Sequence, residues 1–259
     1  DLEQNQGAIL HRYMLGVYDF LERLHERYPA LLIEGCSGGG GRFDAGMLYY
    51  TPQIWCSDNT DAIERVKIQY GTSFAYPSCT VGSHVSAVPN HQTGRTTELA
   101  TRAAVAMAGS FGYELDLNLL TEEEKEQVRA QIKNYHRFEM LIRQGRYYRL
   151  TDVWQKKEYA AWEYCRPDGS EALVTVVTLD TQCNPATEYV KLRGLGEDKK
   201  YRVEVVGMQT GGENGQRING TPNSVEPEYY TGAQLVHAGL PVPRLGNEYK
   251  SWQVYVKEV

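Results

Sequence analysis

The chain has 259 residues, a length at which one large domain and two ordinary domains are both possible. Its formal net charge is −6 and its sequence pI is near 5.6, so it lacks the clustered excess of Lys and Arg that a nucleic-acid or anionic membrane surface requires. No apolar run approaches the roughly 20 residues that span a bilayer, and DLEQNQGAIL lacks the basic start and apolar centre of a signal peptide. We therefore expect no nucleic-acid partner and no membrane association.

The cysteines are odd in number and widely scattered, unlike the paired pattern of a secreted disulfide scaffold. This usage predicts reduced thiols in a cytoplasmic protein. No CxxC or HxxxH pair occurs, so we expect neither a structural zinc site nor a cofactor. The five cysteines are Cys36, Cys56, Cys79, Cys165 and Cys183.

Two helices and two strands are predicted in the first 71 residues. Apolar residues recur every three to four positions over 7–28, which predicts an amphipathic helix that Pro29 ends. The apolar run ALLIEGC, 30–36, follows as a predicted buried strand. A second strand at 54–56 leads into a helix over 59–71, with Asn59 or Thr60 as its cap.

Two further units follow in the same order. A strand and loop are predicted over 78–90, then a helix over 96–109. The alternating stretch 111–117 predicts a strand, and a capping box at TEEE begins a long helix over 121–144. Four strand and helix units in sequence predict parallel strands with helices outside them.

Past about residue 150 the helical periodicity disappears. Four β-rich runs alternate with turn signals such as PDGS and GED, which predicts an antiparallel β-sandwich over 151–259. Residues 209–223 are rich in Gly and Asn and are predicted to form a surface loop. The predicted class is therefore α/β plus all-β. Residues 1–150 amount to half of an eight-stranded (β/α)8 barrel, and such a half would leave open strand edges.

Polar segments follow the predicted strands, where ligands bind in parallel α/β proteins. The most unusual is EGCSGGGGRFD, 34–44, with four consecutive glycines. Glycine lets backbone approach a ligand closely and adopts positive φ. A phosphate cradle and a purely structural tight loop are the alternatives, although no GxxxxGK[ST] motif is present to support the first.

Two carboxylates follow the second predicted strand. Asp61 fits the first turn of the next helix, where the helix dipole favours an acid. Asp58 comes directly after the apolar run IWC, where partial burial would raise the pKa of a carboxyl and keep it protonated as a general acid. His84 and His91, in the next loop, are interpreted as hydrogen-bonded structural residues rather than ligand contacts.

The ordered motifs EGCSGGGGRFDAGMLYYTPQIWCSDNTDAIERVKIQYGTSFAYP, GSHVSAVPNHQTGR and GYELDL resemble the α-galactosidases, or melibiases, of glycoside hydrolase family 36. The resemblance implies a retaining hydrolase of terminal α-1,6-linked galactose, as in melibiose and raffinose. It also implies a (β/α)8 TIM barrel followed by an antiparallel β-sandwich. This chain matches the C-terminal half only: the second half of the barrel, 1–150, and the sandwich, 151–259.

The resemblance also assigns roles to residues. The SDNTD motif places the family's acid/base, the proton donor, on Asp58. The CSGGG loop of the family contacts bound galactose, which implies substrate contacts by Cys36, Ser37, Gly38 and Gly39. Arg42 and Asp44 match the motif and are assigned mainly to holding the loop. The chain has Cys56 where threonine is common in the family, a change expected to affect packing.

The KWD type motif that carries the family's nucleophile does not occur in the chain. Either the full enzyme was cut, or only part of it is represented here, or a second polypeptide supplies the rest. We expect the chain alone to be inactive, the missing N-terminal part of the enzyme to be its partner, and the intact protein to be a homo-oligomer, commonly a tetramer among relatives. A raffinose-type transglycosidase and a noncatalytic carbohydrate-binding protein are the alternative functions.

Overall fold

The computed structural model describes residues 5–183, 186–206, 228–243 and 248–259. The chain divides into two compact units, Asp1–Asp58 with Thr80–Gly82, and Asn59–Cys79 with Ser83–Val259. The surface loop predicted at 209–223 lies outside the described residues. Within the described ranges, no helix combines the length and apolar character needed to cross a bilayer.

The first unit contains two parallel strands, each with a polar segment after it. Gly35 of the first strand lies opposite Ile54 of the second, and Ile54 also forms a parallel bridge to Val81. The parallel direction predicted for these strands is thus observed. The elements of this unit are α1 (Gln6–Arg27), β1 (Glu34–Gly35), α2 (Ser37–Gly40), α3 (Ala45–Tyr50) and β2 (Gln53–Ile54).

The helix α1 forms where the periodicity predicts it, but the first strand differs from its prediction. The predicted buried strand at 30–36 is reduced to Glu34–Gly35, and Leu32 is 88% exposed. Within the described part of the chain β1 pairs with β2 and with no other strand, so the residues before it are left uncovered. An apolar run predicts burial only where a neighbouring element exists to cover it.

The second unit begins with three helices and two paired strands. The long helix α6 starts with the predicted capping box, in which Thr121 and Glu124 each bond the other's backbone N–H. The strands β3 and β4 are neighbours in a two-stranded sheet. These elements are α4 (Ala62–Thr72), η1 (Ser78–Thr80), β3 (Gly82–Ser86), α5 (Leu99–Ala106), β4 (Ser110–Glu114), η2 (Leu117–Leu119) and α6 (Glu122–Gln144).

A six-stranded sheet with the order β10-β9-β12-β7-β6-β5 forms the rest of this unit, and all its neighbouring strands are antiparallel. A short antiparallel pair, β8 with β11, forms a separate two-stranded sheet. These elements are β5 (Arg146–Arg149), β6 (Tyr159–Cys165), β7 (Glu171–Thr178), β8 (Tyr189–Val190), β9 (Lys200–Val205), β10 (Glu228–Thr231), η3 (Gln234–Ala238), β11 (Leu240–Pro241) and β12 (Ser251–Glu258).

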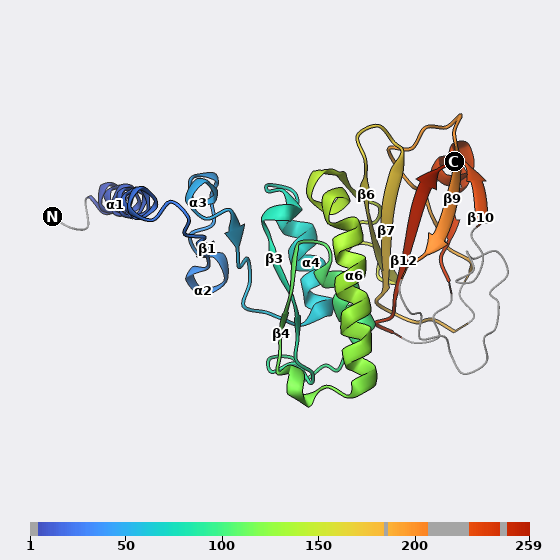
Figure 1. The fold of residues 1–259 in the computed structure, drawn as a ribbon, viewed down its shortest axis with the longest axis horizontal. Helices are drawn as coiled ribbons and strands as arrows, with labels where there is room; N and C mark the ends of the chain where they lie inside the picture. Colours follow the sequence, from blue (N-terminus) through green and yellow to red (C-terminus); the bar gives the residue numbers. More distant parts are fainter. Residues whose placement is uncertain (1–4, 184–185, 207–227, 244–247) are drawn as a thin grey trace. The chain divides into compact units, whose positions relative to one another are not determined.

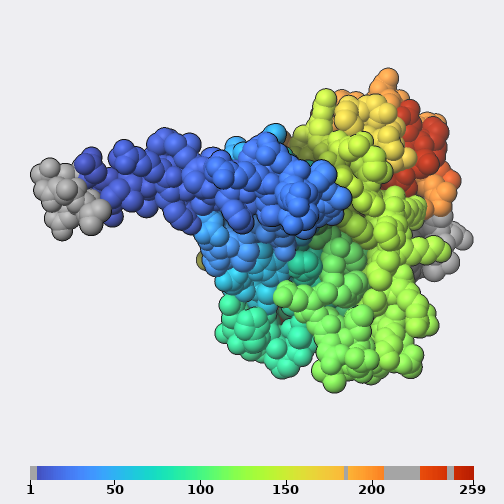
Figure 2. All heavy atoms as spheres, turned by 60° about the vertical axis from the view of Figure 1, so that its left-hand side comes forward, coloured from blue at the N-terminus to red at the C-terminus, as the bar shows by residue number. Residues whose placement is uncertain are grey.

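Both faces of the large sheet are buried, each against a different cover. On one face Trp162 and Tyr164 pack with Phe138 and other residues of α4, α5 and α6. Figure 1 shows these helices between the β3–β4 pair and the sheet, and Figure 2 shows much of the outer side of α6, in green, open to solvent. On the other face Ala161 and Trp252 pack against the segment of β8, η3 and β11. Strands buried on both faces explain the nearly continuous apolar runs in their sequences.

Glu163 is an exception inside this core, because it is a fully buried carboxyl on β6. Its Oε2 accepts the backbone N–H of Arg193 at 2.8 Å, while Oε1 has no hydrogen-bond partner among the described residues. Burial raises the pKa of Glu163 to about 8, although the Arg193 N–H opposes the shift. The folded protein therefore holds this carboxyl neutral at pH values where the unfolded chain ionises it.

We expect Glu163→Gln to remove a pH-dependent loss of stability. In the native sequence the free energy of unfolding falls as pH rises from about 4.5 through about 8, since only the unfolded state releases the proton there. Glutamine keeps the acceptor and cannot ionise. Urea unfolding at pH 5 and pH 8 should show a smaller difference for Glu163→Gln than for the parent or for the exposed control Glu123→Gln; an unchanged difference contradicts the assignment.

Candidate active site

Ser37 and the first three of the four glycines form a left-handed turn shortly after β1, and Gly41 returns to a right-handed conformation. Positive φ values run through Ser37 (63°), Gly38 (65°), Gly39 (75°) and Gly40 (96°). This region costs a residue with a Cβ about 1–2 kcal/mol, so a run of glycines is what makes the turn possible. Ser37 adopts it without that freedom, and backbone strain of this kind concentrates at functional sites.

The turn lies against the backbone that follows β2. A Cβ added to Gly39 would be 2.8 Å from the backbone N of Asp58 and 3.2 Å from Cα of Ser57. A Cβ on Gly40 would be 3.2 Å from the carbonyl oxygen of Cys56. The glycines therefore allow the segment after β1 to touch the segment after β2, and this contact brings together the residues that the sequence singled out.

Side chains at the end of the turn fix it in place. Asp44 caps α3 by accepting the N–H of Met47 at 2.7 Å, and it also accepts the hydroxyl of Tyr18 on α1 at 3.0 Å. Arg42 donates to the hydroxyl of Tyr13 at 3.2 Å. Both contacts agree with the loop-holding role expected for Arg42 and Asp44.

Asp58 itself is exposed, which differs from the partial burial expected after the run IWC. Ile54 is buried, but the described residues do not cover the chain where it leaves the strand. Cys36 and Gly38 are exposed, and Ser37 and Gly39 are half-buried. Burial therefore does not support a proton donor at Asp58, and the role depends on the motif and on the place of Asp58 beside the turn.

Asp61 has the opposite environment, at 2% exposed. It caps α4 through the N–H groups of Ile63 and Glu64, and it also binds Arg95 at 2.5 Å and the hydroxyl of Thr93. Burial acts to raise the pKa of Asp61, but these hydrogen bonds outweigh it and lower the pKa. The predicted cap at Asn59 or Thr60 was wrong, because the helix begins at Ala62 and Asp61, held in place by Arg95 and Thr93, occupies the N-cap position.

Arg95 is the residue here that the sequence argument left unassigned. It lies 34 positions from Asp61, so no local pattern links the two. His84 lies on β3 and not in the following loop, and its Nδ1 is 4.0 Å from Oε2 of Glu114 at the end of β4, too far for the expected hydrogen bond. His91 is exposed. Among the described residues, no three His, Cys, Asp or Glu side chains gather to hold a metal ion.

Asp58 does not line either of the following two hollows, one in each unit. In the first unit a hollow of about 530 Å³ lies between α1 and the start of the turn, and Cys36 is on its edge. Its lining is mostly apolar, from residues such as Phe20, Leu21 and Ile54. A sugar presents hydroxyl groups that need polar partners, so this hollow by itself is a poor pocket for galactose.

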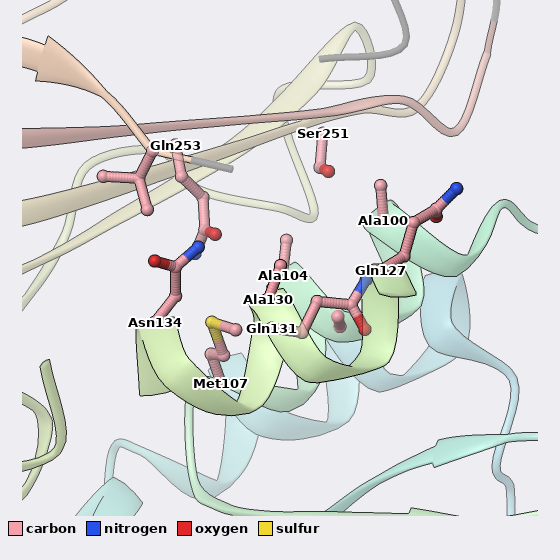
Figure 3. A pocket seen from close by; sticks show the side chains of 11 residues that line it. Ala100, Ala104, Met107, Gln127, Ala130, Gln131, Asn134, Ser251 and Gln253 are labelled. Carbon is pink, nitrogen blue, oxygen red and sulfur yellow. The ribbon is translucent and has the colours of Figure 1, made fainter. Parts of the chain in front are cut away.

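A smaller hollow of about 50 Å³ lies in the second unit, among α5, α6 and β12 (Figure 3). Alanines line its floor, and amides such as Gln127, Asn134 and Gln253 point into it. Its lining holds no carboxylate, histidine or cysteine. It therefore offers no group for acid, base or nucleophilic chemistry.

Two family models together match most of the chain. Residues 1–145 match the family model "Melibiase", and residues 159–256 match "Glycosyl hydrolase family 36 C-terminal domain". The chain belongs to the melibiases, glycoside hydrolase family 36. The resemblance found in the motifs is thus confirmed.

Two curated relatives show how much of the family's length is present. The chain is 54% identical over 253 residues to the bifunctional alpha-galactosidase/sucrose kinase AgaSK of Mediterraneibacter gnavus, covering 98% of this chain and 25% of that protein. It is 43% identical over 256 residues to alpha-galactosidase AgaA of Geobacillus stearothermophilus, covering 99% and 32%. The chain therefore spans about a quarter to a third of the length of these relatives.

Solved structures agree with the family. The galactosidase domain of AgaSK matches with a TM-score of 0.84 at 54% identity, over 96% of this chain and 32% of that one. A substituted form of the G. stearothermophilus enzyme AgaA, in complex with raffinose, matches with a TM-score of 0.84 at 42% identity, over 96% and 32%. The fold of this chain is therefore that of part of a family 36 α-galactosidase.

Gly38 and Gly39 are neighbours in the turn, but only Gly39 lies in close contact with other backbone. Gly38 has similar φ, but a Cβ there would meet nothing within 4 Å. We expect Gly38→Ala to lower the free energy of unfolding by about 1–2 kcal/mol, the conformational cost alone. Gly39→Ala should lose about 1–3 kcal/mol more, because its methyl group displaces the Asp58 backbone. Denaturant unfolding measures both, and equal losses would show that the close contact is unimportant.

Proposed function

We propose that this chain is part of a retaining α-galactosidase that releases terminal α-1,6-linked galactose from melibiose and raffinose-type oligosaccharides. The observation that carries the proposal is the contact of the glycine turn with the backbone of Asp58, whose nitrogen would be 2.8 Å from a Cβ added to Gly39. This contact supports placing the family's galactose-contact segment next to its acid/base position. The relatives named as alpha-galactosidases support the reaction class.

In this proposal galactose lies over the turn. Cys36, Ser37, Gly38 and Gly39 contact the sugar, and the absence of side chains at the glycines lets main-chain groups approach its hydroxyls. The positive φ values fix the directions of these backbone groups before the substrate arrives. Such preorganisation favours binding because less chain entropy is lost on association.

Asp58 is proposed as the proton donor and acid/base. It protonates the glycosidic oxygen as the bond to the leaving group breaks, while a carboxylate nucleophile forms a covalent galactosyl intermediate. Asp58 then removes a proton from the water that releases galactose. We propose that the nucleophile belongs to the part of the relatives' length that this chain does not cover, since the KWD type motif is not in its sequence.

We propose that the chain has the two-part architecture that the motifs imply. Residues 1–150 form the second half of a (β/α)8 barrel, supported by the parallel β1, β2 and Val81 arrangement. Residues 151–259 form the C-terminal antiparallel β-sandwich domain, supported by the six-stranded sheet and the β8–β11 pair that packs on it. A tetrameric assembly of the intact protein and a cytoplasmic location remain proposals from the sequence.

The acid/base role predicts that Asp58→Asn distinguishes substrates by their leaving groups. In the intact enzyme, melibiose turnover should fall by about 10²–10⁴-fold, because its sugar leaving group needs protonation. Glycosylation by p-nitrophenyl α-galactoside should suffer much less. Steady-state and burst kinetics on both substrates measure this difference.

Asp61→Asn is the matched control, since it removes a carboxylate three positions away that caps α4. It should lower stability and change both substrates alike. If Asp58→Asn lowered the glycosylation rate equally for melibiose and for p-nitrophenyl α-galactoside, this result would contradict its role as proton donor.

The missing motif predicts that the purified 259-residue chain does not hydrolyse p-nitrophenyl α-galactoside. Adding the remaining part of the enzyme as a separate polypeptide, or expressing the two as one chain, should restore hydrolysis. Release of p-nitrophenol measured by absorbance tests this. Hydrolysis by the isolated chain that Asp58→Asn abolishes would show that the nucleophile lies within these residues.

A further inference from the structure

A group of charged side chains lies in the second unit on the helix-covered face of the six-stranded sheet, beside α6. It surrounds a hollow of about 530 Å³. Figure 1 shows α6 alongside β6, β7 and β12, with β9 and β10 beyond them. We call it the arginine groove; it is lined by Arg137, Arg166, Glu171, Arg202, Glu204, Tyr255 and Lys257.

Strand register brings these residues together from distant parts of the chain. Lys257 on β12 lies opposite Glu171 on β7 and, on its other side, opposite Arg202 on β9. Residues opposite one another point to the same face of a sheet. Arg166 joins this row at the turn after β6, where its backbone N–H bonds the carbonyl of Glu171 at 2.8 Å. The row thus holds three cations and one carboxylate.

Arg137 adds a fourth cation from α6. Its guanidinium stacks 4.8 Å above the ring of Tyr255 and pairs with Glu204. Arg202 shares Glu204, at 3.1 Å. Glu171 is likewise shared, by Arg166 at 3.2 Å and Lys257 at 3.8 Å. Four cations divided between two carboxylates leave an excess of two positive charges, in a chain whose net charge is −6.

The carboxylates of the arginine groove are less exposed to solvent than its cations. The carboxylate side chains are 24% exposed for Glu204 and 23% for Glu171. The cationic side chains are about half exposed, from 47% for Arg202 to 58% for Lys257. The carboxylates therefore lie beneath, and the surface that a solute meets is positive.

Placing Lys257 directly opposite Arg202 has an energetic consequence. Two like charges at opposed positions on neighbouring strands destabilise the sheet. Glu171 lies next to Lys257, and Glu204 next to Arg202, but neither carboxylate lies between the two cations in the register. An anion bound over this pair would offset the repulsion.

We propose that the arginine groove binds the phosphate group of a small phosphorylated molecule, with Arg202 and Lys257 as its main contacts. Guanidinium groups donate paired hydrogen bonds that match phosphate oxygens, and a lysine adds a mobile charge. The hollow exceeds the size of phosphate alone and leaves room for an attached sugar. Tyr229, opposite Arg202 on β10 and 66% exposed, provides an aromatic ring at the end of the row for such a sugar. This site does not depend on the hydrolytic function.

Thermal unfolding and calorimetry of the complete enzyme in phosphate-free, low-salt buffer test the proposal, with inorganic phosphate, glucose 6-phosphate and glucose as probes. Glucose replaces galactose so that the candidate galactose site does not contribute. We expect both phosphates to bind and raise Tm, and glucose to have no effect. Tighter binding of glucose 6-phosphate than of inorganic phosphate would show that the site prefers a sugar phosphate. Equal affinities would show that the site recognises only the phosphate group. Both results support the site.

Lys257→Gln and Arg202→Gln should each weaken phosphate binding by about tenfold. Without phosphate, Lys257→Gln should be at least as stable as the parent, because it relieves the repulsion with Arg202; this separates lost binding from lost folding. Lys67→Gln, at an exposed position on α4, is the control and should bind normally. The proposal is wrong if neither phosphate binds, if all three variants bind alike, or if only an acidic polymer such as polyglutamate binds.

Discussion

The backbone of the glycine turn approaches the backbone of Ser57 and Asp58 so closely that no side chain fits between them. A Cβ on Gly39 would come within 2.8 Å of the Asp58 nitrogen. Everything proposed about the active site depends on this contact, because it joins the segments that follow two parallel strands. The strands set the directions of the two segments, and the absence of side chains lets them meet.

The two aspartates of the SDNTD motif show how environment separates roles. Asp61 is buried, caps α4 and binds Arg95, so its carboxylate is committed to structure. Asp58 is exposed beside the turn, which is compatible with the proton-donor role proposed for it. A second separation occurs on the sheet, where Glu171 and Glu204 lie beneath the cations of the arginine groove. In both places burial fixes one set of charges and leaves another set exposed.

Features that depend on residues close together in the sequence were predicted correctly. Helical periodicity gave α1, α4, α5 and α6, and the capping box at Thr121 was found where TEEE predicts it. The motifs placed the chain in its family and singled out the turn and Asp58. The left-handed conformation at Ser37 was not predicted, because only the surrounding structure makes a non-glycine residue accept positive φ.

Predictions failed where a distant partner decides the outcome. The run at 30–36 was expected to be buried, yet Leu32 is exposed because β1 has a single strand partner among the described residues. The cap of α4 was misassigned because Arg95, 34 positions away, stabilises Asp61. No local sequence pattern predicted the arginine groove, since strand register brings Arg202 next to Lys257.

The most direct test of the central claim is a crystal structure of the complete polypeptide with bound raffinose. The account predicts galactose over the turn at Cys36 to Gly39, with a carboxyl oxygen of Asp58 about 2.6–3.2 Å from the glycosidic oxygen. Raffinose bound with its galactose away from the turn, or with another carboxyl at the glycosidic oxygen, would contradict it.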